Sequence, residues 1–315
     1  MGTSETAPSL RAVGVRCPYA DVAPSVRSWI EDALSSRVVE ATDQVGGMSP
    51  GCAARLRTQA GRRVFVKAVG RELNPDTPGL FRHEAGVLGR LSPQDYRAAL
   101  LAAYDDGDWV ALLIEDVEGR HPDLAAPGDY ACVKEVVARQ AAELTPSPVG
   151  SEVGSFADVA RRWAGLWSEP IADHPATYLP AWAVARFDEL RARVESLPAR
   201  LSGSTLAHFD IRDDNLLIRP DGRAVIFDWG MARIGPDWAD LFVLALNVVD
   251  RRDFDREMEE AGADSKDTVT DALLAWGGAQ SWNARRPERP GLPTLAAYCK
   301  EDARRLLVGA RRRLS

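Results

Sequence analysis

Cysteine, histidine and methionine are scarce in this sequence of 315 residues, with 4 of each. The cysteines Cys17, Cys52, Cys132 and Cys299 lie far apart and form no CxxC pair. This spacing argues against a disulfide framework and against a cysteine-based zinc site. The sequence therefore favours a reducing compartment, and we expect a cytoplasmic protein.

Long apolar runs and an excess of positive charge are also missing. The longest apolar runs, residues 98–104 and 241–246, are far shorter than the roughly 18 residues of a membrane span. Acidic residues outnumber basic ones, 46 against 39, which gives a formal net charge of −7. A broad basic surface for nucleic acid is not expected from this balance. We therefore predict neither a membrane nor a nucleic-acid partner.

The composition is that of a folded globular protein, because 45% of the residues are hydrophobic and 27% are charged. Its richness in Ala and Arg is typical of a GC-rich bacterial genome. Residues 1–20 are predicted to be a flexible arm. Apolar periodicity and turn residues then predict a first lobe over residues 21–115. Its expected elements are a helix at 24–34, strands at 38–45, 53–59 and 63–69, a helix at 79–91, and strands at 100–104 and 109–114.

A change of pattern follows at residues 116–119, which are predicted to join the two lobes. Residues 120–315 have mainly the apolar rhythm of helices. The expected helices are 130–144, 156–167, 181–194, 237–249, 267–276 and 295–314, interrupted by a strand hairpin at 216–219 and 224–227. The sequence thus predicts an α+β fold with an antiparallel sheet lobe and a larger helical lobe.

The most informative stretch is residues 206–230, which contains His208, Asp210 and Asn215 before the hairpin and Asp228 after it. Phosphoryl transfer needs a carboxylate to orient and deprotonate an acceptor hydroxyl, and oxygen ligands to hold Mg²⁺ on the phosphates. Asp210 fits the first role, and Asn215 with Asp228 fits the second. The alternative is that these residues only cap loops and turns.

The pattern HxDxxxxN at residues 208–215, followed by Asp-Trp-Gly at 228–230, resembles the aminoglycoside phosphotransferase-like branch of the protein-kinase-like fold. The resemblance extends from about residue 38 to 315. It implies a bilobal fold with ATP and Mg²⁺ bound in the cleft between the lobes, GTP being the alternative nucleotide.

The resemblance also implies a lysine on the third strand and a glutamate on the next helix. Lys67 and Glu84 match these positions, and an ammonium held by a carboxylate can bind the α- and β-phosphates. Glu72 and His83 are alternative partners for the lysine. Lys67 could also be an ordinary surface lysine of an edge strand.

Two further segments match the nucleotide-binding side of the family. Gly46, Gly47 and Ser49 lie in a loop predicted to cover the phosphates, although glycines in a hairpin often serve only the turn. Backbone groups of Glu115 and Val117 are expected to meet the adenine edge at the hinge. The alternative for this second segment is a plain strand end.

Arg212 follows the catalytic aspartate by two residues, where a fixed cation could neutralise the transferring phosphoryl group. A structural salt bridge is the alternative. Asp240 matches an aspartate that supports the catalytic loop in the family, or else begins a helix. For the acceptor side, the resemblance indicates residues 150–200 and 250–315. The tryptophans in these segments could stack on a sugar or base or belong to the core; they are Trp163, Trp167, Trp182, Trp276 and Trp282.

The resemblance therefore implies an ATP-dependent small-molecule O-phosphotransferase, expected to inactivate an antibiotic of aminoglycoside, peptide or nucleoside type. A metabolic kinase for choline, homoserine, a ketosamine or a thiosugar carries the same motifs. A nucleotide-binding regulator without transfer activity is the alternative outside enzymes. We expect a monomer or a homodimer.

Overall fold

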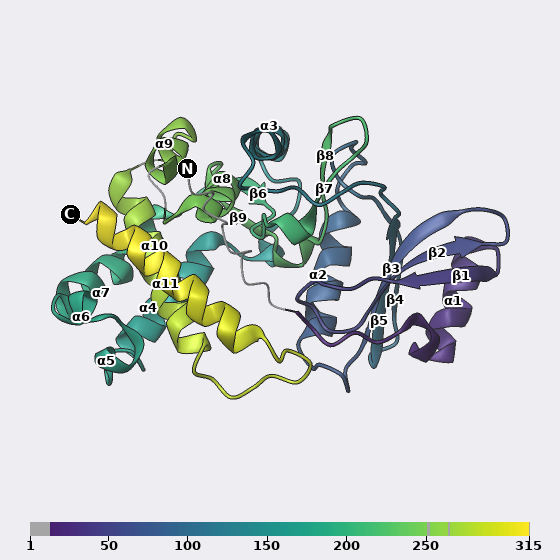
Figure 1. The fold of residues 1–315 in the computed structure, drawn as a ribbon, viewed down its shortest axis with the longest axis horizontal. Coiled ribbons are helices and arrows are strands. Elements are labelled where there is room, and N and C mark those ends of the chain that lie inside the picture. The colour runs from purple at the N-terminus through teal and green to yellow at the C-terminus, as the bar shows by residue number, and fades with distance from the viewer. Residues whose placement is uncertain (1–12, 251–252, 264, 315) are drawn as a thin grey trace, which may run out of the picture.

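A five-stranded antiparallel sheet forms the centre of the first lobe in the computed structural model, which describes residues 13–250, 253–263 and 265–314 (Figure 1). The strands lie in the order β1-β2-β3-β5-β4. Their bounds are β1 Val38–Asp43, β2 Cys52–Thr58, β3 Arg63–Gly70, β4 Leu100–Asp105 and β5 Trp109–Glu115. This arrangement confirms the sheet lobe expected from the sequence.

Helices cover both faces of this sheet. Helix α1 (Pro24–Leu34) covers one face, where its Val26 and Ile30 pack in one cluster with Ala111 and Leu113 of β5. Helix α2 (Thr77–Leu88) packs Phe81 on the other face, where Val110, Leu112 and Ile114 of β5 point. Because side chains alternate along a strand, burial on both faces explains why β5 is almost continuously apolar.

The second lobe is mainly helical, which confirms the helical lobe expected from the sequence (Figure 1). Its helices are α3 Pro127–Glu143, α4 Phe156–Ser168, α5 Pro175–Tyr178, α6 Ala181–Val184, α7 Phe187–Ser196, α8 Ala239–Ala245, α9 Asp253–Glu260, α10 Lys266–Asn283 and α11 Leu295–Arg313. Helices α10 and α11 pack against each other along their length, and α10 also contacts α4. Leu273 and Leu274 of α10 and Leu306 and Leu307 of α11 belong to the largest hydrophobic core among the described residues.

Two small antiparallel sheets form the framework of the cleft. Strand β6 (Thr205–Ala207) pairs with β9 (Arg233–Gly235), and β7 (Leu216–Ile218) pairs with β8 (Ala224–Ile226). The second pair is the hairpin expected from the sequence. The loop from β6 to β7 and the segment after β8 therefore begin and end at fixed points on the same side of the helical lobe.

Some elements differ from the expectations. The helix expected at 181–194 is divided into α6 and α7, because Arg186 leaves helical geometry with φ −121° and ψ 23°. The helix expected at 267–276 continues to Asn283 as α10. Helix α9 and the pair β6 and β9 were not expected.

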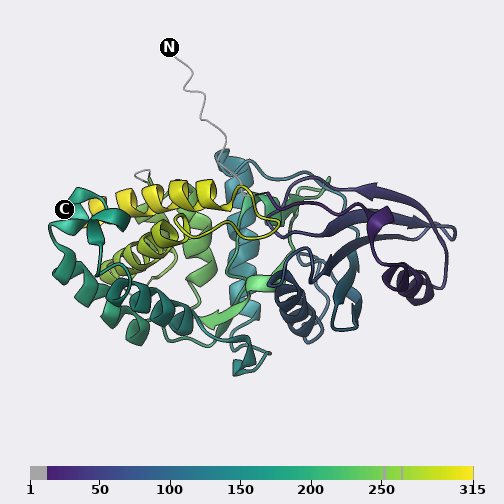
Figure 2. The same ribbon diagram turned by 90° about the horizontal axis from the view of Figure 1, so that it is seen from below.

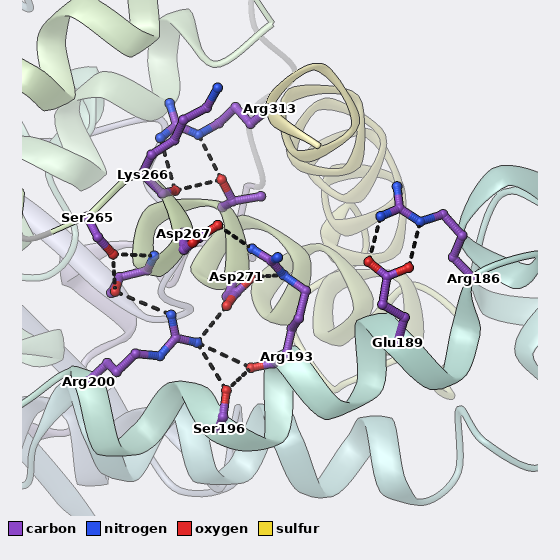
Figure 3. Close-up of polar contacts among 12 residues, drawn as sticks. Arg186, Glu189, Arg193, Ser196, Arg200, Ser265, Lys266, Asp267, Asp271 and Arg313 are labelled. Carbon is purple, nitrogen blue, oxygen red and sulfur yellow. Dashed lines mark hydrogen bonds and ion pairs between the residues drawn. The ribbon is translucent and has the colours of Figure 1, made fainter. Parts of the chain in front are cut away.

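An ion network centred on the buried Asp271 fastens α7 and the turn that follows it to α10 (Figure 3). The carboxylate of Asp271 on α10 accepts from Nε of Arg193 at 2.6 Å and from Nη2 of Arg200 at 2.6 Å. The Asp271 side chain is only 3% exposed, whereas each arginine keeps about a third or less of its side chain in contact with solvent. Asp267 accepts a further bond from Arg193 at 2.8 Å.

Only residues 13–20 of the arm expected at 1–20 fall within the described chain. Residues 13–17 make backbone hydrogen bonds to the loop before β2 and to the segment before α11, and 19–21 form a short 3-10 turn. Among the described residues, no helix is both long and apolar enough to cross a membrane.

Candidate active site

The sequence motifs meet at a cavity of about 260 Å³ between the lobes. From the first lobe it is lined by the loop 44–49, by Lys67 on β3 and by Phe81 on α2. From the second lobe it is lined by Asn215, Phe227 and Asp228. The elements that carry these residues are far apart in sequence but lie side by side at the cleft (Figure 2).

A larger cavity of about 740 Å³ lies beside the end of β3 and is lined by Gly70, Trp109 and Asp21, among others. Among the described residues that line this larger cavity, there is no candidate catalytic or metal-binding residue expected from the sequence. We therefore place the candidate active site at the smaller cavity, which is lined by Lys67, Asn215 and Asp228, and Asp210 is bonded to Asn215 beside it.

Lys67 lies at the centre of an ion cluster. Its Nζ atom is 3.0 Å and 2.9 Å from the two carboxylate oxygens of Glu84, and 3.1 Å from Oδ1 of Asp228. The alternation of β3 directs Phe65, Lys67 and Val69 to the face covered by α2, which brings the ammonium to Glu84. The structure thus pairs Lys67 with Glu84, rather than with Glu72 or His83.

The electrostatics of this cluster follow from its burial. Burial alone would lower the pKa of the Lys67 ammonium, but the charges of Asp228 and Glu84 raise it above its ordinary value. Burial raises the pKa of Glu84 to about 7, against the opposing effect of Lys67. Lys67 is therefore a fixed cation. Glu84 also accepts the backbone N–H of Trp229 at 3.3 Å, which links α2 to the Asp-Trp-Gly motif.

Asp240 anchors the backbone of residues 208–215, here called the catalytic loop because it contains the candidate catalytic Asp210. The two carboxylate oxygens of Asp240 accept the backbone N–H groups of His208 at 2.8 Å and Phe209 at 2.7 Å, and Gln140 donates to it at 2.9 Å. Asp240 is 2% exposed. A buried carboxylate with three donors holds this backbone in one position.

His208 connects the loop to the strand β8. Its Nδ1 atom accepts the backbone N–H of Asp210 at 3.2 Å, so Nε2 carries the proton and donates to the carbonyl of Phe227 at 3.0 Å. Burial lowers the pKa of His208, in agreement with a neutral ring. His208 thus fixes the spacing between Asp210 and the Asp-Trp-Gly motif.

Asp210 and Asn215 are joined directly. The amide Nδ2 of Asn215 donates to the backbone carbonyl of Asp210 at 2.9 Å and to its carboxylate at 2.8 Å. Asp210 keeps 26% of its side chain exposed, and burial between the lobes raises its pKa despite the opposing charge of Arg212. Since Nδ2 is used in this way, the amide oxygen of Asn215 is the atom left for a cation.

Arg212 is held between two carboxylates. It donates to both oxygens of Asp214, at 3.1 Å and 3.0 Å, and its Nε lies 3.4 Å from Asp210. Burial would lower the pKa of this guanidinium, but Asp210 and Asp214 raise it. This geometry favours the structural salt bridge over direct contact with a phosphoryl group.

Backbone strain is concentrated at the two motifs. Phe209 lies within the first motif and Asp228 opens the second, and their φ values are 65° and 69°. A left-handed conformation costs a residue other than glycine about 1–3 kcal/mol and persists where the surroundings enforce it. Here Asp240 and Lys67 supply such contacts, on Phe209 and Asp228 respectively.

The remaining predicted residues also line the cavity: Gly46, Gly47, Ser49, Glu115 and Val117. Gly46 and Gly47 have φ values of 90° and 79°, which explains the choice of glycine at both positions. At the hinge, the N–H of Glu115 donates to Ala99, and the carbonyl of Val117 accepts from Arg55 at 2.9 Å.

A magnesium ion fits the oxygen donors of the cleft. No group of three or more His, Cys, Asp or Glu side chains in the described residues is placed to hold a metal alone. Magnesium on a nucleotide, however, needs only one or two protein oxygens besides the phosphates. The carboxylate of Asp228 and the amide oxygen of Asn215 provide this donor set at the cavity wall.

The tryptophans named for the acceptor side serve mostly as core. Trp167 is fully buried, and Trp163 and Trp182 pack against the same cluster. Trp276 on α10 stacks on Phe209 of the catalytic loop, with ring centroids 6.0 Å apart and planes at 7°.

Arg16 also lines the cavity but was not predicted from the sequence, because the segment before α1 carries no periodic signal.

Solved structures of similar fold include aminoglycoside phosphotransferases and a choline kinase. At TM-score 0.59 and 16% identity, the chain is similar to a thermostable mutant of the aminoglycoside phosphotransferase APH(4)-Ia in a ternary complex with ADP and hygromycin B, over 90% of this chain and 98% of that one. It is similar to the choline kinase LicA from Streptococcus pneumoniae at TM-score 0.55 and 16% identity, over 91% and 98%. An aminoglycoside phosphotransferase from Alicyclobacillus acidocaldarius gives TM-score 0.50 and 17% identity, over 90% and 95%. The two-lobed kinase-like fold is thereby confirmed.

The sequence itself matches the profile of the phosphotransferase enzyme family (APH) over residues 53–305. A search of curated proteins gives no significant match. The chain belongs to the phosphotransferase enzyme family and is a small-molecule kinase with a hydroxyl acceptor.

Proposed function

We propose that this protein is an ATP-dependent O-phosphotransferase that inactivates an antibiotic by phosphorylating one of its hydroxyl groups. The observation that carries the proposal is that Lys67, Asn215 and Asp228 line one cavity. Glu84 is bonded to Lys67 there, and Asp210 is bonded to Asn215. The structural similarity to APH(4)-Ia, solved with ADP and hygromycin B, supports the choice of an antibiotic acceptor.

We assign nucleotide binding to β3, to the hinge, and to the loop of residues 44–51 between β1 and β2, here called the glycine loop. Lys67, held by Glu84, binds the α- and β-phosphates of ATP. Backbone groups of Gly46, Gly47 and Ser49 cover the phosphates, and backbone groups of Glu115 and Val117 meet the adenine edge. Asn215 and Asp228 hold Mg²⁺, which neutralises negative charge on the phosphates when bound.

Asp210 acts on the acceptor. Its carboxylate accepts the proton of the attacking hydroxyl while the acceptor oxygen forms a bond to the γ-phosphorus and the bond from that phosphorus to the β,γ-bridging oxygen breaks. ADP and a phosphate monoester are the products. Arg212 stabilises the ionised form of Asp210 through their contact at 3.4 Å, so we assign it a positioning role.

A mass-spectrometric screen tests the proposal. The full-length protein with Mg²⁺ and ATP or GTP is incubated with pooled aminoglycoside, peptide and nucleoside antibiotics, and separately with choline, homoserine, ketosamines and thiosugars. We expect a gain of one phosphoryl group on an antibiotic. A gain on a metabolite alone would identify a metabolic kinase, which the similarity to choline kinase makes the second candidate.

The Asp210→Ala variant is the control for this screen, because it keeps the nucleotide residues and removes the proposed base. A product formed equally by the variant would show that the transfer does not depend on Asp210 and would overturn its assignment as the base. Nucleotide binding with no phosphorylated product from any acceptor would favour the non-catalytic regulator. The oligomeric state, monomer or homodimer, is measured on the same sample by light scattering.

A further inference from the structure

The segment of residues 13–17, here called the N-terminal strap, is bonded to the glycine loop. The N–H of Gly14 donates to the carbonyl of Gly47 at 3.0 Å. Cys17 donates to Gly51 at 3.2 Å, and Gly51 donates back to Val15 at 3.1 Å. A Cβ atom on Gly14 would lie 2.4 Å from the carbonyl oxygen of Met48, so this close approach requires glycine.

The strap is also bonded to the second lobe. Its Val15 N–H donates to the carbonyl of Gly291 at 2.8 Å, and its Val13 N–H donates to Oγ1 of Thr294 at 2.6 Å. Both partners precede α11, and Figure 2 shows this part of the chain running to the N-terminal segment. The strap therefore occupies a fixed place between the lobes, on the side of the cleft where the glycine loop lies.

Arg16 is the strap residue that reaches into the nucleotide cavity. Its Nη1 donates to the carbonyl of Ser49 at 2.8 Å, and its Nη2 donates to the carbonyl of Gly46. The side chain lines the same cavity as Lys67 and Asp228. A Cβ atom on Gly47 would lie 2.4 Å from Nη2 of Arg16, which shows how tightly the loop is folded over the guanidinium.

The charge of Arg16 lacks a close counter-charge in the described chain. Its two described acceptors are neutral carbonyls, and no described carboxylate forms an ion pair with it. The Nε atom is buried without a hydrogen-bond partner. Burial lowers the pKa of this guanidinium, and the carboxylates of Asp228 and Asp214 oppose the effect through space. A half-buried cation without a close counter-charge is unfavourable until an anion approaches it.

We propose that Arg16 is a nucleotide-binding residue that pairs with the phosphates of the bound nucleotide from beneath the glycine loop. The N–H groups not used by Gly46 and Ser49 donate to phosphate oxygens, for which the planar guanidinium is well suited. The strap places this charge in advance, so the loop and the cation form one phosphate site. The inference rests on the proposed nucleotide role of the cavity and adds a residue outside the matched family region, which begins at residue 53.

Calorimetric titrations with ADP and with adenosine test the proposal, because the two ligands differ only in the phosphates. We expect Arg16→Gln to weaken ADP binding by about 10- to 100-fold, the range for a lost charge-assisted hydrogen bond. Adenosine affinity is expected to stay within about 2-fold of the parent, which also shows that the variant is folded. Arg16→Lys keeps the charge and should recover part of the loss.

Arg57→Gln is the matched control, because Arg57 lies on β2 with an exposed ion pair to Glu40 and does not line the cavity. It should bind both ligands like the parent. Equal losses for ADP and adenosine in Arg16→Gln would show that Arg16 only shapes the loop, and unchanged ADP affinity would exclude a phosphate contact. Either result overturns this inference alone. A parent protein that binds neither ligand would overturn the proposed function as well.

Discussion

The Nζ atom of Lys67 lies 3.1 Å from Oδ1 of Asp228. The group proposed to hold the phosphates and the group proposed to hold the metal are therefore in direct contact. Glu84 completes the cluster from the other side, with its side chain fully buried. Each of the three charged side chains is stabilised by its neighbours in the cluster. Their mutual stabilisation can be measured as a change in the free energy of unfolding.

Lys67→Met should lower the free energy of unfolding by about 3 kcal/mol, because Glu84 then remains buried without its counter-charge. Lys67→Met combined with Glu84→Gln should recover part of this loss. Denaturant titrations of the parent, both single variants and the double variant measure the coupling. Strictly additive losses would mean that the two side chains do not stabilise each other.

Asp210→Asn should reduce kcat by at least about 10²-fold, the lower range for a lost general base. ADP affinity should hardly change, because Lys67 and Asp228 keep their contacts. Steady-state kinetics and calorimetry separate the two effects. Asp221→Asn, at the exposed turn between β7 and β8, is the control and should turn over normally. Undiminished turnover in Asp210→Asn would remove Asp210 from the catalytic role.

The rate should fall on the acid side as Asp210 becomes protonated, since a base must be ionised. Burial raises the pKa of Asp210, so the midpoint of this fall in kcat/KM lies above the ordinary value of about 3.9 for aspartate. Arg212 opposes that rise, so Arg212→Gln should move the midpoint to higher pH.

Arg223→Gln is the control for the pH profile, because Arg223 lies in the turn between β7 and β8 and pairs there with the partly exposed Asp221 and Asp95. Its midpoint should coincide with that of the parent. A midpoint that stays in place, or moves to lower pH, in Arg212→Gln would show that Arg212 does not stabilise the ionised carboxylate.

Asp271→Asn should lower the free energy of unfolding by about 2 kcal/mol, because two arginines lose their shared buried acceptor. The partial exposure of both guanidinium groups allows water to compensate, which keeps the loss below that of a fully buried pair. Glu189→Gln, which breaks the exposed pair with Arg186 in Figure 3, should leave stability nearly unchanged. Similar losses in both variants, measured by urea titration, would contradict the role of burial.

Much of the fold could be predicted because the sheet lobe has clear patterns. The apolar run of β5 and the alternation of β3 identify strands without reference to the rest of the chain. Helix α9 was missed because most of its residues are charged. Only Phe254 and Met258 are apolar in it, four residues apart, and their burial shows that packing supports the helix.

The candidate site could be predicted where its residues form spaced motifs, as Asp210 and Asn215 do. The partner of Lys67 was also predicted, since one strand and the following helix bring Glu84 to it. The sequence left two roles for Arg212, contact with the phosphoryl group or a structural salt bridge. The direction of its side chain, which the sequence does not reveal, decides for the salt bridge with Asp214. Arg16 gave no signal, because its place depends on hydrogen bonds to residues 30 or more positions away.

The stack of Phe209 on Trp276 joins the catalytic loop to α10, and Trp276 in turn stacks on Trp163 of α4 at 5.2 Å. Helices α4 and α10 belong to the segments assigned to the acceptor. Substitutions that reshape those helices to admit a different acceptor must therefore preserve this column of rings, because Phe209 otherwise loses its support on α10. Changes in acceptor range are therefore expected at residues around the three stacked rings and not in the rings themselves. Mutant libraries made to change the acceptor should keep Phe209, Trp276 and Trp163 constant.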